Sequence, residues 1–152
     1  MRLLDFSLLA LVRPILLVLG QFGSIAVLLF CGVWEMPWWS WGLFVLGLVV
    51  FAWAAFSLGG NNFTIMPVPR AGNTLSQDGI YRWLRHPMYT AVLLCGLGVT
   101  LGAPNVWRWS ALVVCTVVLL VKIRYEEGLL TQRHPTYPQQ MQGVARLIPG
   151  IW

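Results

Sequence analysis

The sequence predicts an all-α membrane protein with about four transmembrane helices, and three observations lead to this prediction. Of the 152 residues, 58% are hydrophobic and only 10% are charged, whereas a soluble domain carries about 25% charged residues. The mean hydropathy of +0.72 excludes a disordered chain, which requires low hydrophobicity. The apolar residues also form runs close to the length of about 20 residues that one membrane-spanning helix requires.

The four predicted spans follow one another along a single domain, residues 1–152. Residues 15–34 form the first span and contain no formal charge. Residues 38–58 form the second, after a short turn. Residues 88–101 form the third, which is short for a span, so it either starts below the interface as an amphipathic helix or lies partly inside the protein. The less favoured alternative is a protein of three spans in which this run is only re-entrant. Gly102, Ala103 and Pro104 end this run, and residues 106–123 form the fourth.

The distribution of Lys and Arg predicts the orientation, because cytoplasmic loops carry an excess of these residues. With both termini on one side, Arg108 is the only basic residue on the other side. A belt of aromatic residues is expected at that other side, formed by Trp34, Trp38, Trp39, Trp41, Trp107 and Trp109. Both termini are therefore predicted to be cytoplasmic. The net charge of +5 suits a membrane surface better than nucleic acid, so we expect no nucleic-acid partner.

Neither cysteine nor histidine predicts a metal site. The three cysteines lie in apolar stretches and form no CxxC pair, which is typical of buried apolar cysteines. His86 and His134 lack the helical spacing of a ligand pair, so no metal is expected.

The densest polar stretch, residues 78–89, comes just before the third apolar run and contains the sequence Arg-His-Pro-Met-Tyr at 85–89. Pro87 suits the first position of a helix, and a helix start attracts carboxylates and phosphates. Arg85, His86 and Tyr89 would surround that point. The alternative is an anchor at the membrane interface, in which Arg and Tyr extend to the lipid headgroups. A second Arg-His-Pro-x-Tyr at 133–137 has no flanking similarity and is interpreted as coincidence.

A pair of carboxylates, Glu126 and Glu127, follows the fourth span. Adjacent helical residues point about 100° apart, so we expect that both cannot face one pocket directly. The alternative is a solvated ladder in which Lys122 pairs with Glu126 and Arg124 with Glu127, which would contribute only tenths of a kcal/mol.

The stretch from Gly79 to Tyr89, the pair Glu126-Glu127 and the sequence Arg-Leu-Ile-Pro at 146–149 together resemble the isoprenylcysteine carboxyl methyltransferase family. They are also similar to the related phospholipid N-methyltransferases. The resemblance covers roughly residues 61–152. It implies a multi-pass membrane enzyme that uses S-adenosylmethionine, with a cytoplasmic cofactor site built from the loop before the third helix and the C-terminal segment.

The resemblance also implies roles for individual residues. Those expected to act in catalysis are Arg85, His86, Glu126 and Glu127. Those expected to bind the cofactor are Asn73, Thr74, Leu75, Ser76, Tyr81, His86, Pro87, Met88, Tyr89 and Glu126. Lys122, or alternatively Arg124, is expected to bind the substrate.

The implied reaction is methylation of a lipidic or small hydrophobic acceptor, by family the carboxylate of an isoprenylcysteine-like molecule. A carboxylate acceptor needs no general base, whereas an amine would need a proton acceptor such as His86 or Glu127. Two alternatives remain. A membrane sterol reductase that uses NADPH has a similar helical arrangement, but its usual Asp-Glu followed by Arg-Cys is absent here. A non-enzymatic membrane scaffold would need these residues for stability alone.

Overall fold

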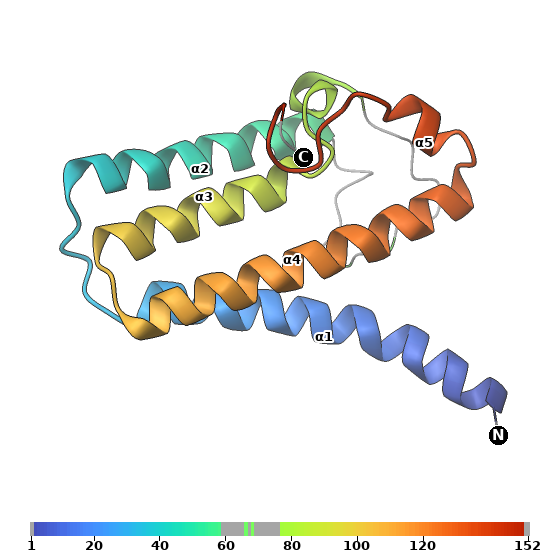
Figure 1. The fold of residues 1–152 in the computed structure, drawn as a ribbon, viewed down its shortest axis with the longest axis horizontal. Coiled ribbons are helices and arrows are strands. Elements are labelled where there is room, and N and C mark those ends of the chain that lie inside the picture. The colour runs from blue at the N-terminus through green and yellow to red at the C-terminus, as the bar shows by residue number, and fades with distance from the viewer. Residues whose placement is uncertain (1, 59–65, 67, 69–76, 151–152) are drawn as a thin grey trace.

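In the computed structural model, all the regular secondary structure elements of the residues it describes, 2–58, 66, 68 and 77–150, are helices, which confirms the predicted fold class (Figure 1). The bounds of the helices are α1 Arg2–Phe30, α2 Trp38–Leu58, the 3₁₀ turn η1 Gly79–Arg82, α3 Pro87–Gly102, α4 Val106–Arg133 and the short α5 Tyr137–Gln140.

Three of these helices are long and apolar enough to cross a membrane, over residues 12–30, 38–58 and 106–133. The fourth, α3, is apolar but has only 16 residues. At 1.5 Å per residue it is about 24 Å long, which is shorter than the hydrocarbon core of about 30 Å. The third predicted run is therefore a helix, as expected, and it is a short one.

The first span ends earlier than predicted, because α1 stops at Phe30 instead of continuing to residue 34. Gly32 takes a φ of +147°, outside the helical region. Carbonyl groups at and just beyond the end of this helix accept hydrogen bonds from residues at the start of α4 and just before it. Arg108 Nε donates to Leu28 O at 3.2 Å, and Asn105 Nδ2 donates to Cys31 O at 2.9 Å. Arg108 is fully buried, and its positive charge is stabilised at the negative end of the α1 dipole.

The helices pack as two pairs, α2 with α3 and α1 with α4, and α3 also contacts α4 and α1. Small residues allow α2 and α3 to come close together, as they do between many membrane helices. A Cβ added at Gly98 would lie 3.0 Å from the backbone nitrogen of Phe44. Ser40 Oγ donates a hydrogen bond of 2.5 Å to Gly98 O across the same interface.

The connections α1–α2 and α3–α4 lie at one end of the bundle, on the left of Figure 1, and the predicted tryptophan belt falls on these turns and the helix ends beside them. The start of α1, the turn η1 and the C-terminal segment lie away from that end. The chain therefore begins and ends on the same side of the bundle. That this side is cytoplasmic stays a prediction from the distribution of Lys and Arg.

Candidate active site

The C-terminal segment, residues 141–147, lies across the start of α3. Arg85 N donates to Ala145 O at 2.8 Å, and His86 N donates to Arg146 O at 3.1 Å. Thr90 Oγ1 donates to Leu147 O at 2.8 Å one turn further along α3. Residues nearly 60 positions apart in the sequence thus meet through the backbone.

The side chain of Arg85 holds the same segment. Its Nε donates to Val144 O at 2.9 Å and its Nη2 to Met141 O at 2.6 Å. Its Nη1 donates to Glu127 Oε1 at 3.3 Å. One guanidinium therefore joins the start of α3, the C-terminal segment and α4, which uses the fork of donors that distinguishes Arg from Lys.

His86 lies between the two carboxylates that the sequence singled out. It caps the N-terminus of α3, and Pro87 follows in the first turn as predicted. His86 Nδ1 is 3.8 Å from Glu126 Oε2, and His86 Nε2 is 3.4 Å from Glu127 Oε1. His86 is 7% exposed, and among the described residues Nε2 faces Glu127 Oε1 without the geometry of a good hydrogen bond. A buried polar atom without such a partner is uncommon and calls for an explanation.

The expectation that Glu126 and Glu127 cannot share one pocket is wrong. Their side chains are long enough to reach opposite edges of the single imidazole ring of His86. The predicted end of the fourth span at residue 123 also falls inside a helix, because α4 continues to Arg133. Glu126 lies 20 residues after Val106, or about 30 Å along the helix axis. That distance matches the thickness of the hydrocarbon core, so a span that begins at Val106 would place the pair near the membrane surface.

Tyr89 joins His86 to Glu126. Its hydroxyl donates to Glu126 Oε2 at 2.9 Å, and its ring stacks on His86 with centroids 5.4 Å apart and planes 5° from parallel. Tyr81, in η1, is buried beside this group. Burial, together with the charge of Glu126, raises the pKa of Tyr81, so the phenol stays neutral.

The second carboxylate, Glu127, is held by two guanidinium groups. Besides Arg85, it accepts a hydrogen bond of 2.9 Å from Nε of Arg146. The alternative in which Glu127 pairs with Arg124 along the surface of α4 is wrong. Arg124 is exposed, and the arginines that contact Glu127, Arg85 and Arg146, come from other segments. Both oxygens of Glu127 are thus occupied, whereas the side chain of Glu126 is 25% exposed.

Lys122 lies one helical turn before Glu126 and is buried, with 2% of its surface exposed. Its Nζ donates to Gln21 Oε1 at 2.5 Å and lies 5.1 Å from the centroid of the Tyr89 ring. Of the two residues suggested for substrate binding, only Lys122 therefore lies beside the group around His86.

The structure brings together most of the residues that the sequence singled out. Pro87 is fully buried, and Met88 packs against the cluster of Ile80, Tyr81 and Leu84. Asn73, Thr74, Leu75 and Ser76 lie outside the described residues.

Three residues that the sequence did not assign to the site belong to the same group of contacts. These are Arg146, Gln21 and Tyr137, which is buried at the start of α5. Burial and the charge of Glu127 raise the pKa of Tyr137, while Arg85 lowers it. A signal existed for Gln21, which is the only amide in the first apolar run.

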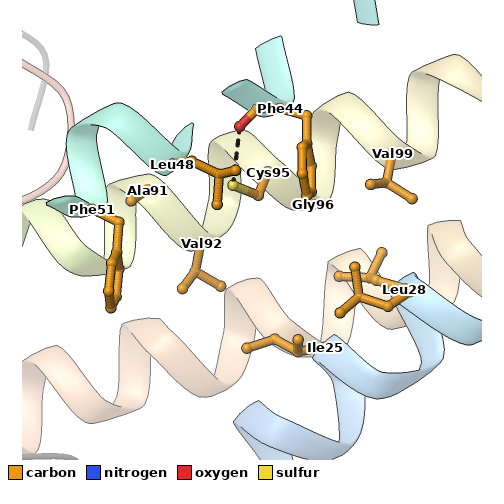
Figure 2. Close-up of a pocket in the computed structure, with 11 residues that line it drawn as sticks. Ile25, Leu28, Phe44, Leu48, Phe51, Ala91, Val92, Cys95, Gly96 and Val99 are labelled. Carbon is orange, nitrogen blue, oxygen red and sulfur yellow. Dashed lines mark hydrogen bonds between the residues drawn. The ribbon is translucent and has the colours of Figure 1, made fainter. Parts of the chain in front are cut away.

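An apolar cavity of about 260 Å³ lies between α1, α2 and α3 (Figure 2). Leu48 and Phe51 on its wall are 50% and 40% exposed, so the cavity opens toward the surroundings of the bundle. Its wall reaches Val92, one turn of α3 beyond Tyr89. The residues that line it are Ile25, Leu28, Leu29, Phe44, Leu48, Phe51, Ala91, Val92, Cys95, Gly96 and Val99.

Comparison with known proteins identifies a family. The sequence model of a family described as phospholipid methyltransferase matches residues 36–137, which is more than half of the chain. The matched region contains α2, η1, α3 and α4, and with them His86, Tyr89 and both carboxylates. It leaves out α1 and Arg146. A search of curated proteins found no match.

Proposed function

The chain belongs to the phospholipid methyltransferase family and is thus a membrane methyltransferase, and we propose that it transfers the methyl group of S-adenosylmethionine to a lipidic or small hydrophobic acceptor. The observation that carries this proposal is the position of His86 between Glu126 and Glu127 at the start of α3, with Tyr89 joining His86 to Glu126.

These residues fit the charges of the cofactor. S-adenosylmethionine supplies, when bound, a methyl group on a positively charged sulfonium, and it also carries an ammonium and a carboxylate. Glu126 is partly exposed, and its carboxylate suits either positive group. His86 lies at the N-terminus of α3, which is the positive end of the helix dipole, where a carboxylate is favoured. Tyr81, Met88 and Tyr89 would line the same space, and the loop residues Asn73 to Ser76 stay expected contacts.

Arg85 and Glu127 are best explained as positioning residues. The guanidinium of Arg85 is engaged with two backbone carbonyls and Glu127. Glu127 accepts from Arg85 and Arg146, so it is poorly placed to take a proton from a substrate. Together they fix His86 and the C-terminal segment against α4, and a closed site that holds the reacting groups in line lowers the barrier.

The residues present also bear on the acceptor. A carboxylate acceptor, such as that of an isoprenylcysteine-like molecule, needs no general base. An amine acceptor needs one, and because both oxygens of Glu127 are engaged, His86 is the better candidate. The apolar cavity supports an acceptor with a hydrocarbon tail, because an apolar cavity of only about 150 Å³ already binds benzene.

The experiment is a measurement of thermal stability on the detergent-purified protein with S-adenosylhomocysteine, S-adenosylmethionine or NADPH. A ligand at 100 times its Kd stabilises by about 2.7 kcal/mol. We expect the two adenosyl ligands to stabilise the wild type and NADPH to have no effect. Glu126→Gln and His86→Ala should lose the response, whereas Arg124→Gln, an exposed change on the same turn of α4, should keep it.

Acceptors are then compared in a methyl-transfer assay, with an S-prenylated cysteine and a phosphatidylethanolamine in parallel. A folded wild type that does not respond to either adenosyl ligand would refute the proposal. A response to NADPH alone would favour the reductase, and the absence of any response would favour a scaffold.

A further inference from the structure

The apolar cavity between α1, α2 and α3 runs lengthwise through the bundle, with Ala91 and Val92 at one end and Val99 at the other (Figure 2). From Ala91 to Val99 the axis of α3 rises by about 12 Å. Val92 follows Tyr89 by about one helical turn. The cavity therefore has a near end beside the group around His86 and a far end deeper in the membrane-spanning region.

The far end of the cavity is closed, and its side is open. Val99 and Leu28 at the far end are 0% and 2% exposed. A Cβ added at Gly96 would lie 3.1 Å from Cδ1 of Leu28, so α3 and α1 pack closely there. Leu48 and Phe51 on the open side belong to α2, a helix long and apolar enough to cross a membrane. A chain can thus enter from the lipid, but it cannot extend past Val99.

The wall of the cavity suits a hydrocarbon and no polar group. Of the described residues that line it, only Cys95 has a polar atom in its side chain, and that thiol already donates to Phe44 O at 3.4 Å. A buried water needs two to four polar partners, so a cavity of this kind stays dry and binds apolar molecules. We therefore expect a hydrocarbon chain as the ligand.

The volume of the cavity sets the length of chain that it can hold. An apolar cavity of about 150 Å³ binds benzene, which has six carbons, so each carbon takes about 25 Å³. At that value the 260 Å³ found here accommodates about ten carbons. A longer chain would have to displace the buried side chains at the far end, which is costly in a packed interior.

We propose that this cavity binds the hydrocarbon tail of the acceptor, and that Val99 at its closed end limits the part of the tail that is held to about ten carbons. The assignment rests on the proposed function, because the acceptor would lie with its reacting group near His86 and its tail along α3. Part of the wall comes from α1, which lies outside the region matched to the family, so the match does not imply this limit.

The experiment measures the binding of N-acetyl-S-alkylcysteines with hexyl, octyl, decyl, dodecyl and tetradecyl chains to the protein in phosphatidylcholine nanodiscs. Affinities are referred to the probe concentration in the bilayer, because partitioning into lipid itself strengthens with each carbon. A carbon that fills the cavity adds packing contacts, whereas a carbon beyond its end overpacks it. The wild type should therefore bind the decyl probe at least about fivefold tighter than the hexyl and tetradecyl probes.

Two variants at Val99 should move this optimum in opposite directions. Val99→Phe adds four side-chain carbons at the closed end, so the best probe should become about hexyl, and Val99→Ala removes two, so it should become about dodecyl. Val113→Phe is the matched control, because it makes the same change at a residue of α4 that is 60% exposed and does not line the cavity. Its optimum should stay at decyl.

The proposal is overturned if the optimum of a folded Val99 variant stays at decyl, or if the wild type shows no preference for length, as it would if chains of the bilayer lipid filled the cavity. Binding of S-adenosylhomocysteine is measured on the same samples. If the length preference is present but S-adenosylhomocysteine does not bind, the proposed methyl transfer fails and the tail site stands. If S-adenosylhomocysteine binds without any length preference, the tail site fails and the methyl transfer stands.

Discussion

Replacing Arg85 by alanine tests whether the C-terminal segment is part of the site. The change removes two hydrogen bonds to backbone carbonyls, of Met141 and Val144, and one to Glu127. The side chain is 18% exposed, so these groups are largely desolvated, and each bond from a charged donor contributes about 1.5–3 kcal/mol. Such contributions do not add fully, and we expect a loss of about 3–5 kcal/mol, the range for breaking a buried pair.

Much of this loss should appear as detachment of residues 141–147 from α3. The backbone hydrogen bonds from Arg85 and His86 to the segment would then weaken, and Arg146 would no longer be held beside Glu127. Since 1.4 kcal/mol corresponds to a factor of ten, the affinity for S-adenosylhomocysteine should fall by at least about tenfold. Limited proteolysis should cleave the C-terminal segment of the variant faster than that of the wild type.

Two matched variants make the result specific. Arg82→Ala removes an exposed arginine from the adjacent turn η1, and it should leave both measurements unchanged. Arg85→Lys keeps a positive charge near Glu127 but cannot serve three acceptors in the fork geometry of a guanidinium, so it should fall between the wild type and Arg85→Ala. The reasoning is refuted if Arg85→Ala resists protease and binds the ligand as well as Arg82→Ala does.

Two further predictions concern a glycine turn and the orientation of the chain. Gly79→Ala should lower the free energy of unfolding by at least about 1 kcal/mol more than Gly143→Ala does. Both glycines have a positive φ, but only at Gly79 would the new Cβ collide with a neighbour, Ser57. Equal losses in the two variants would contradict this prediction. In sealed vesicles of known orientation, the exposed Cys31 should react with an impermeant maleimide added on the side opposite to both termini. A cysteine introduced at the exposed Thr131, in a Cys31→Ser background, should react with the reagent added on the side of the termini. Labelling of both positions from one side would refute the topology.

Local signals in the sequence were sufficient for much of the site. Pro87 after His86 predicted a helix start, and that start is where α3 begins. The spacing of the apolar runs predicted that the start of α3 and the end of α4 would lie on the same side of the bundle. Two polar groups that flank antiparallel spans on one side tend to meet, and His86 does meet Glu126 and Glu127.

Contacts between distant segments could not be predicted in the same way. The return of the C-terminal segment to α3 depends on hydrogen bonds to backbone carbonyls, which every residue possesses, so no residue type marks Val144 or Ala145 as a partner of Arg85. The end of α1 at Phe30 depends on donors from Asn105 and Arg108, more than 70 positions away. A count of charges in the loops placed Arg108 opposite to both termini, at the end of the bundle where α4 begins (Figure 1), but gave no sign that it is buried.

The charges around His86 bear on the kind of acceptor that the site favours. Among the described residues around His86, Arg85, Arg146 and Lys122 carry three positive charges, and Glu126 and Glu127 carry two negative ones. S-adenosylmethionine carries a net positive charge, so its binding would increase the excess of positive charge near a medium of low dielectric constant, where charge interactions are strong. An acceptor that brings a carboxylate or a phosphate offsets this excess, and a positively charged amine without an anionic group increases it.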